Sequence, residues 1–129
     1  MTKAAALFGF YSSFDLPAYE ENSVPTGDDA PELPYLTYNI AVGDIHNDTA
    51  LTASLWYAER DGYSALREAT DKAEEICTIV GRGGHVLPCD GGVIWIRLGI
   101  PKYQIMGDDT DPKIKRVYMN FTASYLTAV

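Results

Sequence analysis

Apolar residues recur along this chain at two spacings, which divide it into helical and extended segments. In residues 3–14 and 63–80 they fall three and four positions apart, as on one face of an α-helix. The second segment is the clearer helix, because charged residues border its apolar stripe along its whole length. Asp61 or Ser64 can cap its start and Gly81 can end it.

Five further segments have the alternating or short apolar pattern of β-strands. They are residues 35–42, 51–57, 85–87, 93–98 and 115–127. The first two are predicted to form an antiparallel hairpin, and Asp90-Gly91 is a strong turn signal between the third and the fourth. The order helix, two strands, helix, three strands predicts an α+β fold, with two helices packed on an antiparallel or mixed β-sheet of about five strands. It disfavours a βαβ nucleotide-binding fold.

Two segments rich in turn-forming residues separate these elements. Residues 20–34 contain three prolines and five acids, and we expect an extended loop that is mobile in the free subunit. Residues 99–101 and 107–112 are predicted to form a second loop, because they contain glycine, proline and aspartate.

Length and composition are those of one ordinary globular domain spanning residues 1–129, with 47% hydrophobic and 22% charged residues. The longest apolar run, residues 4–8, is far shorter than the ~20 residues that cross a bilayer. We therefore expect a cytosolic product with no membrane segment and no signal peptide. The two cysteines, Cys77 and Cys89, are expected to be reduced.

The net charge of −8 lies entirely in residues 1–61, where ten acids face only Lys3 and Arg60. Residues 62–129 carry equal numbers of acidic and basic side chains. A phosphate-binding surface needs clustered lysine and arginine, so direct nucleic-acid binding is disfavoured.

Two acidic runs have residue types that bind metals. Asp44, His46 and Asp48 could place three ligands on one side of a tight loop, but a polar hairpin loop has the same composition. We favour the solvated loop. Asp108, Asp109 and Asp111 are similar to the start of a calcium loop, but they lack its glycine and its distant glutamate, so a loop is again favoured.

Two further patterns are weaker candidates for chemistry. Residues 81–84 (GRGG) follow a helix and therefore cannot present a helix amino terminus to a phosphate. His85 and Cys89 are a base and a thiol four residues apart, with no third group to orient them. We predict no catalytic, cofactor-binding or metal-binding residues and no enzyme activity.

Aromatic residues are predicted on both faces of the strands, more than one layer of helices can cover. They include Tyr35, Tyr38, Trp56, Tyr57, Trp95, Tyr118 and Tyr125. Tyrosine and tryptophan are enriched where proteins meet. Burial in an interface is therefore as good an explanation as burial in a core.

Several segments resemble the small tail proteins of phages and prophages of Gram-positive bacteria. They are residues 9–14 (GFYSSF), 17–25 (PAYEENSVP), 34–38 (PYLTY), 51–57 (LTASLWY) and 91–96 (GGVIWI). The order helix, acidic loop, hairpin, helix, hairpin, final strand is similar to the tail terminator family, whose members form a ring that closes the head-proximal end of a long tail.

This resemblance implies a structural virion protein, made in the bacterial cytoplasm and placed at the head-tail junction. It implies a homohexameric ring that contacts the tail tube protein and the head-completion protein, with DNA passing through its channel without specific binding. No catalytic residues carry over. The alternatives are a head-tail connector or tail-tube subunit of the same phage, a metal-dependent enzyme built on Asp44, His46 and Asp48, and a soluble regulatory domain.

Overall fold

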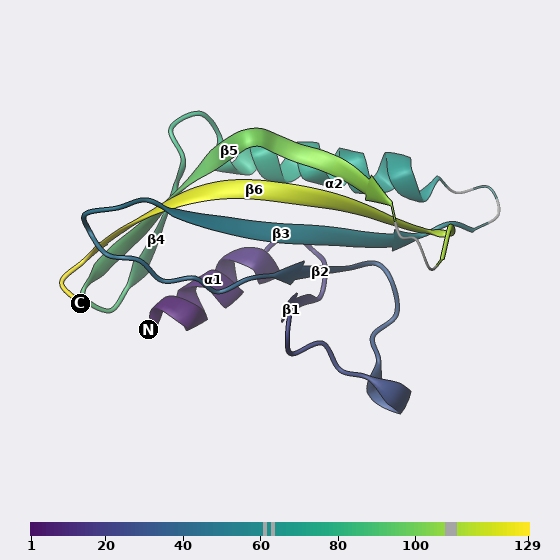
Figure 1. The fold of residues 1–129 in the computed structure, drawn as a ribbon, viewed down its shortest axis with the longest axis horizontal. Helices are drawn as coiled ribbons and strands as arrows, with labels where there is room; N and C mark the ends of the chain where they lie inside the picture. Colours follow the sequence, from purple (N-terminus) through teal and green to yellow (C-terminus); the bar gives the residue numbers. More distant parts are fainter. Residues whose placement is uncertain (61, 63, 108–110) are drawn as a thin grey trace.

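One six-stranded sheet with two helices on one face makes up the fold (Figure 1). The computed structural model describes residues 1–60, 62, 64–107 and 111–129. The helices are α1 (Lys3–Ser12) and α2 (Ala65–Val80), and a short 3₁₀ helix, η1, spans Gly27–Asp29. The strands, in order across the sheet, are β1 (Ala18–Glu20), β2 (Tyr35–Tyr38), β3 (Thr49–Ala58), β6 (Ile114–Thr127), β5 (Gly92–Gly107) and β4 (His85–Cys89). Only the β1–β2 pair is parallel among these ladders.

The predicted α+β class, the two helices and the mixed sheet are confirmed, but the sheet has six strands instead of about five. The additional strand is β1, which lies beside β2 at the edge of the sheet. Backbone bonds from Leu36 N–H to the Pro17 carbonyl and from Glu21 N–H to the Tyr38 carbonyl hold it there. A strand of three residues is too short for an alternating pattern to be recognised.

Several predicted boundaries are wrong. Strand β2 ends at Tyr38 instead of residue 42. At Asn39 the backbone N–H still donates to the Thr52 carbonyl, but the Thr52 N–H donates to the Asn39 side-chain oxygen, at 2.7 Å, instead of to a backbone carbonyl. Helix α1 ends at Ser12, yet Phe14 is still buried in the core. Strand β5 continues to Gly107 through residues that were predicted to form a loop. The β2–β3 and β4–β5 hairpins are confirmed.

Both helices pack on the same face of the sheet. Phe10 of α1 contacts Phe121 of β6 edge to face, with ring centroids 6.1 Å apart. Tyr103, the cross-strand partner of Met119 on that same side of β6, donates its hydroxyl to Glu74 of α2. The buried residues of the helices and strands form one core cluster. Alternate positions of β3, β5 and β6 therefore face the helices, and the intervening positions face away.

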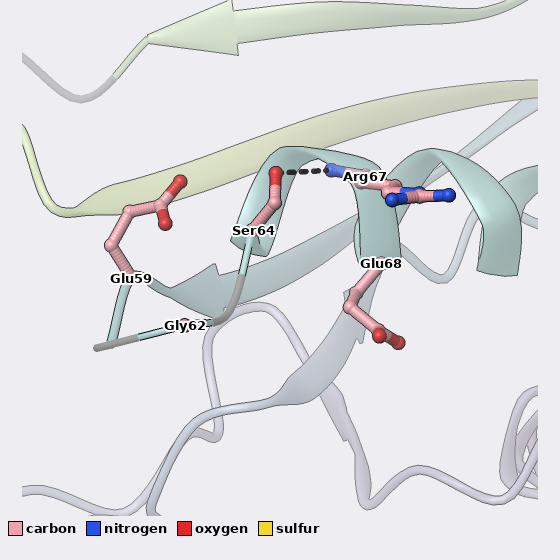
Figure 2. A pocket seen from close by; sticks show the side chains of 5 residues that line it. All are labelled: Glu59, Gly62, Ser64, Arg67 and Glu68. Atoms are coloured by element: carbon pink, nitrogen blue, oxygen red, sulfur yellow. Dashed lines mark hydrogen bonds between the residues drawn. The ribbon is translucent and has the colours of Figure 1, made fainter.

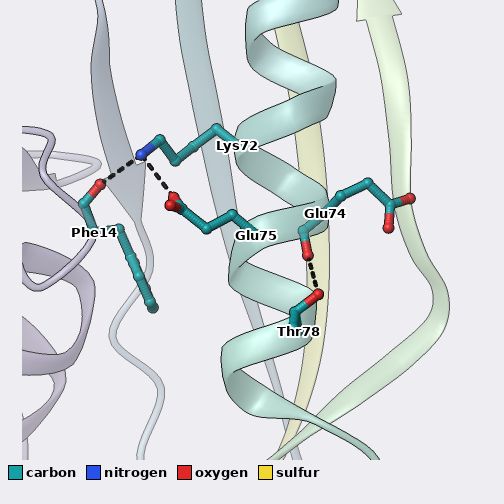
Figure 3. Close-up of polar contacts among 5 residues, drawn as sticks. All are labelled: Phe14, Lys72, Glu74, Glu75 and Thr78. Atoms are coloured by element: carbon teal, nitrogen blue, oxygen red, sulfur yellow. Dashed lines mark hydrogen bonds and ion pairs between the residues drawn. The ribbon is translucent and has the colours of Figure 1, made fainter.

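Helix α2 begins and ends where its sequence indicates. The Ser64 hydroxyl accepts from the Arg67 N–H, and Gly81, at φ 69°, ends the helix with its N–H bonded to the Cys77 carbonyl. Lys72 joins α2 to the turn that follows α1, because its ammonium donates to the Phe14 carbonyl at 3.1 Å, and it also pairs with Glu75 of α2 at 2.7 Å (Figure 3).

Candidate functional site on the open face of the sheet

The side of the sheet turned away from both helices is called the open face here. Cross-strand pairing places on it Tyr19, Tyr35, Thr37, Ser54, Trp56, Trp95, Arg97, Gln104, Met106, Arg116, Tyr118, Asn120, Thr122 and Ser124. Most of these side chains are half-buried although no described helix lies over them. Neighbouring large side chains shield one another from solvent on this face, which no described helix covers.

Four large side chains of the open face form a line across four strands. Tyr35 pairs with Trp56, Trp56 with Arg116, and Arg116 with Met106. Tyr19 extends the line onto β1, because its ring meets that of Tyr35 edge to face at 5.9 Å. These five residues are called the central row.

Arg116 is the only charged member of the central row. Its guanidinium lies over the ring of Trp56, 4.7 Å from the centroid, and over that of Tyr118 at 5.2 Å. Its Nε donates to the Ser54 hydroxyl at 3.0 Å. Within the described residues no carboxylate pairs with it. The guanidinium is therefore positioned by two aromatic rings and one hydroxyl, and most of its N–H donors are not used within the described residues.

Trp56 is fixed in turn by a bond from its indole N–H to the Thr37 hydroxyl at 2.8 Å. A second stack lies on β5, where the Arg97 guanidinium sits 4.2 Å from the ring centroid of Trp95. The Trp95 indole N–H donates to the Gly83 carbonyl at 2.9 Å. The open face thus presents two arginines, each stacked on a tryptophan whose own N–H is satisfied.

Arg97 differs from Arg116 because it has an acidic partner. It pairs with Asp48 at 3.1 Å and donates to Ser124, whose hydroxyl donates to the same Asp48 oxygen at 2.7 Å. The bond from Ser124, followed by those from Arg97, lowers the pKa of Asp48 below its usual value. This cluster fastens the loop before β3 to the sheet.

The structure does not bring the proposed metal ligands together. Asp48 points to Arg97, while Asp44 accepts from the backbone N–H of the exposed His46 within its own loop. Over residues 1–60, 62, 64–107 and 111–129 there is no group of three metal-ligating side chains. Of the second acidic run, Asp108 and Asp109 lie outside the described residues, and Asp111 accepts from the Lys113 N–H.

His85 and Cys89 do not form a nucleophile and base. Both lie on β4, where four residues span about 13 Å. The His85 ring packs beside Phe10 at 5.5 Å. The glycine-rich residues 81–84 form the end of α2 and the loop that holds Trp95, as the helix-stop prediction requires.

A hollow of about 450 Å³ lies at the start of α2 (Figure 2). It is lined by Glu59, Gly62, Ser64, Arg67 and Glu68. The Ser64 hydroxyl is used to cap the helix, and Figure 2 shows the three charged side chains pointing in different directions. No reactive group converges on this hollow in the described part of its wall.

Charge is divided between the sheet and the rest of the molecule. The six strands contain four of the ten lysines and arginines but one of the eighteen acids, Glu20. The helices and connections therefore carry the acidic excess. The sequence revealed the acid excess and the aromatic residues, but not that two arginines stack among the tryptophans of one face. The spacing Trp95-x-Arg97 could have indicated it, because residues two positions apart in a strand lie on the same face.

Comparison of the chain with protein-family models, with curated proteins and with solved structures finds no match in any of the three. Among the described residues, no helix has the length and apolar character needed to cross a membrane. The prediction that aromatic residues lie on both faces is confirmed: Tyr38, Tyr57 and Tyr125 are buried toward the helices, whereas Trp56 and Trp95 lie on the open face. The open face is therefore the candidate site.

Proposed function

We propose that this chain is a structural subunit of a long-tailed phage, which assembles with copies of itself into a ring that ends the tail tube and joins it to the head. The observation that carries the assembly is the central row. Tyrosine, tryptophan, arginine and methionine are the residue types enriched in protein interfaces, and here they cross a sheet face that the chain's own helices leave uncovered.

The phage assignment rests on the resemblance of the ordered sequence segments to tail terminators. The two-layer α+β fold is compatible with it. On this proposal the ring is a homohexamer, it contacts the tail tube protein and the head-completion protein, and DNA passes through its channel. The net charge of −8 supports a channel that does not retain DNA, because like charges repel the phosphate backbone.

Native mass spectrometry of the purified chain, with electron microscopy of the same sample, tests the proposal. We expect a closed ring of six subunits. An open polymer would indicate a tail-tube subunit instead, and a ring of another order would indicate a connector. A monomer at every concentration would overturn the proposal.

A further inference from the structure

We propose that the open face of one subunit binds the acidic segment of a second copy, so that neighbouring subunits join head to tail. The acidic segment is residues 21–32, which lie between β1 and β2 and include η1. The inference rests on the proposed ring and names the contact that would build it.

The acidic segment carries four carboxylates without a cation. Glu21, Asp28, Asp29 and Glu32 are all exposed, and none forms an ion pair with a described residue. Asp28 and Asp29 are adjacent within η1, which projects from the body of the molecule in Figure 1. The segment therefore presents a pair of carboxylates at an outlying position.

The open face offers the complementary group. Arg116 donates its Nε–H to Ser54, and the other N–H groups of its guanidinium have no hydrogen-bond partner in the part of the chain that the structure describes. Contacts with the rings of Trp56 and Tyr118 restrict the guanidinium, so that less conformational freedom is lost when it binds. A planar arginine fork suits a carboxylate because it can donate two parallel hydrogen bonds.

The division of charge favours a second copy as the occupant. Two chains of charge −8 repel each other unless an acidic part of one meets a basic part of the other. The open face supplies that basic part through Arg116, because Arg97 is already paired with Asp48, and the acidic segment is the outlying acidic part. Because the two surfaces are different, their contact is heterologous, and a heterologous contact closes into a ring when the rotation per subunit allows it.

A charge exchange between two variants tests this contact. The first variant is Arg116→Glu, and the second carries Asp28→Arg and Asp29→Arg. In the first variant the glutamate at position 116 would meet Asp28 and Asp29 of the neighbour, and in the second Arg116 would meet two arginines. Like charges therefore meet at every junction of either variant alone, and we expect its association constant to fall by more than about tenfold. Mixed in equal amounts, the two variants have opposite charges at every junction of an alternating ring. We expect native mass spectrometry to show the mixed ring, with three copies of each variant if the ring is a hexamer.

Matched changes elsewhere control for net charge. Arg82→Glu alters an exposed arginine in the loop after α2, and Glu68→Arg with Asp71→Arg alters two exposed acids on α2. We expect both to assemble like the wild type. Circular dichroism reports whether Arg116→Glu folds. The variant of the exposed acidic segment does not depend on sheet packing and tests the contact independently.

Salt gives a second readout. Charges are screened over about 10 Å at 0.1 M salt, so if the contact of Arg116 with the acidic segment joins the subunits, the wild-type ring should weaken as salt rises. If both charge variants form the wild-type ring, the inference is wrong and the proposed function stands. If each variant dissociates but the mixture does not assemble, the two surfaces do not meet and the inference is also wrong. A wild type that never assembles overturns both proposals.

Discussion

The ring of Tyr11 in α1 stacks on the ring of Tyr38 in β2, with centroids 4.5 Å apart and planes inclined by 20°. Tyr11 is completely buried, and its hydroxyl has no hydrogen-bond partner among the described residues. Tyr125 is equally buried, but its hydroxyl donates to the Ala41 carbonyl. Both rings stabilise the core by packing. The buried hydroxyl of Tyr11 lowers the stability because it has no partner, whereas the hydroxyl of Tyr125 contributes a hydrogen bond.

Replacing each of these tyrosines with phenylalanine should therefore have opposite effects. Tyr11→Phe removes a buried polar group without a partner, and we expect the free energy of unfolding to rise by about 1 kcal/mol. Tyr125→Phe removes a hydrogen bond and leaves the Ala41 carbonyl unpaired, so we expect a fall of about 1 kcal/mol. Urea unfolding of both variants measures this. Equal losses would show that the Tyr11 hydroxyl is bonded in solution.

Alkaline pH should destabilise the fold through the same residues. Burial raises the pKa of Tyr125 from 10.0 to about 12 and also raises that of Tyr11. The folded state keeps these phenols protonated after an unfolded chain has lost the protons. The stabilisation is therefore complete below pH 10 and is lost as pH rises from 10 toward 12. Unfolding followed from pH 8 to about 11.5 should show this decline, with a shallower slope for Tyr125→Phe. An unchanged slope would contradict the assignment.

Lys72 should contribute more to stability than its salt bridge does. Its side chain is 19% exposed, and its ammonium donates to the Phe14 carbonyl as well as to Glu75, which is 51% exposed (Figure 3). We expect Lys72→Met to lower the free energy of unfolding by about 1 kcal/mol, because the carbonyl loses a charged donor. Glu75→Gln should cost less than about 0.5 kcal/mol, because exposed pairs contribute little. Thermal unfolding of the two variants tests the order, and a larger loss for Glu75→Gln would reverse our interpretation.

The two isoleucines near the end of α2 should respond differently to the same charge. Ile76 is 1% exposed in the core, whereas Ile79 is 49% exposed. Ile76→Asp would bury an unpaired carboxylate, and we expect a loss of more than about 4 kcal/mol, sufficient to prevent folding. Ile79→Asp should cost less than about 1 kcal/mol. Circular dichroism and soluble yield compare them, and a folded Ile76→Asp protein would mean that α2 packs by another face.

We also predict that the loop with Asp44, His46 and Asp48 binds no divalent metal tightly. Arg97 and Ser124 already occupy the carboxylate of Asp48. Isothermal titration with Zn²⁺ should show no stoichiometric binding by the wild type. One-to-one binding that is lost in His46→Ala would refute this prediction and revive the enzyme alternative.

The long periodic elements were predictable because each one carries its own signal. The stripe of α2, its Ser64 cap and its Gly81 stop are local, and so is the alternation along β3 and β6. Their boundaries agree with the sequence to within two residues at most positions. The buried position of Ile76 follows from the same periodicity.

The rest depends on pairing between distant segments, which alternation does not specify. Arg116 meets Ser54 and Trp56 only because β3 and β6 pair in one particular register, 62 residues apart along the chain at the Arg116–Ser54 bond. Strand β1 exists because β2 offers it an edge. Gly99 and Pro101 predicted that the strand ends there. The structure keeps one strand, because β5 pairs with β6 on both sides of these residues and the Asn120 side chain donates to the Pro101 carbonyl.

That interruption in β5 sets where the length of the strand can change. Leu98 pairs with Phe121, and the next paired residue, Tyr103, faces Met119, so residues 99–102 lie opposite Asn120 alone. A deletion elsewhere in β5 would turn each later side chain to the opposite side of the sheet. Within residues 100–102, where Ile100 is fully exposed, the chain can shorten while both flanking registers persist. Natural or engineered changes in length should therefore be tolerated at this point and rejected on either side of it.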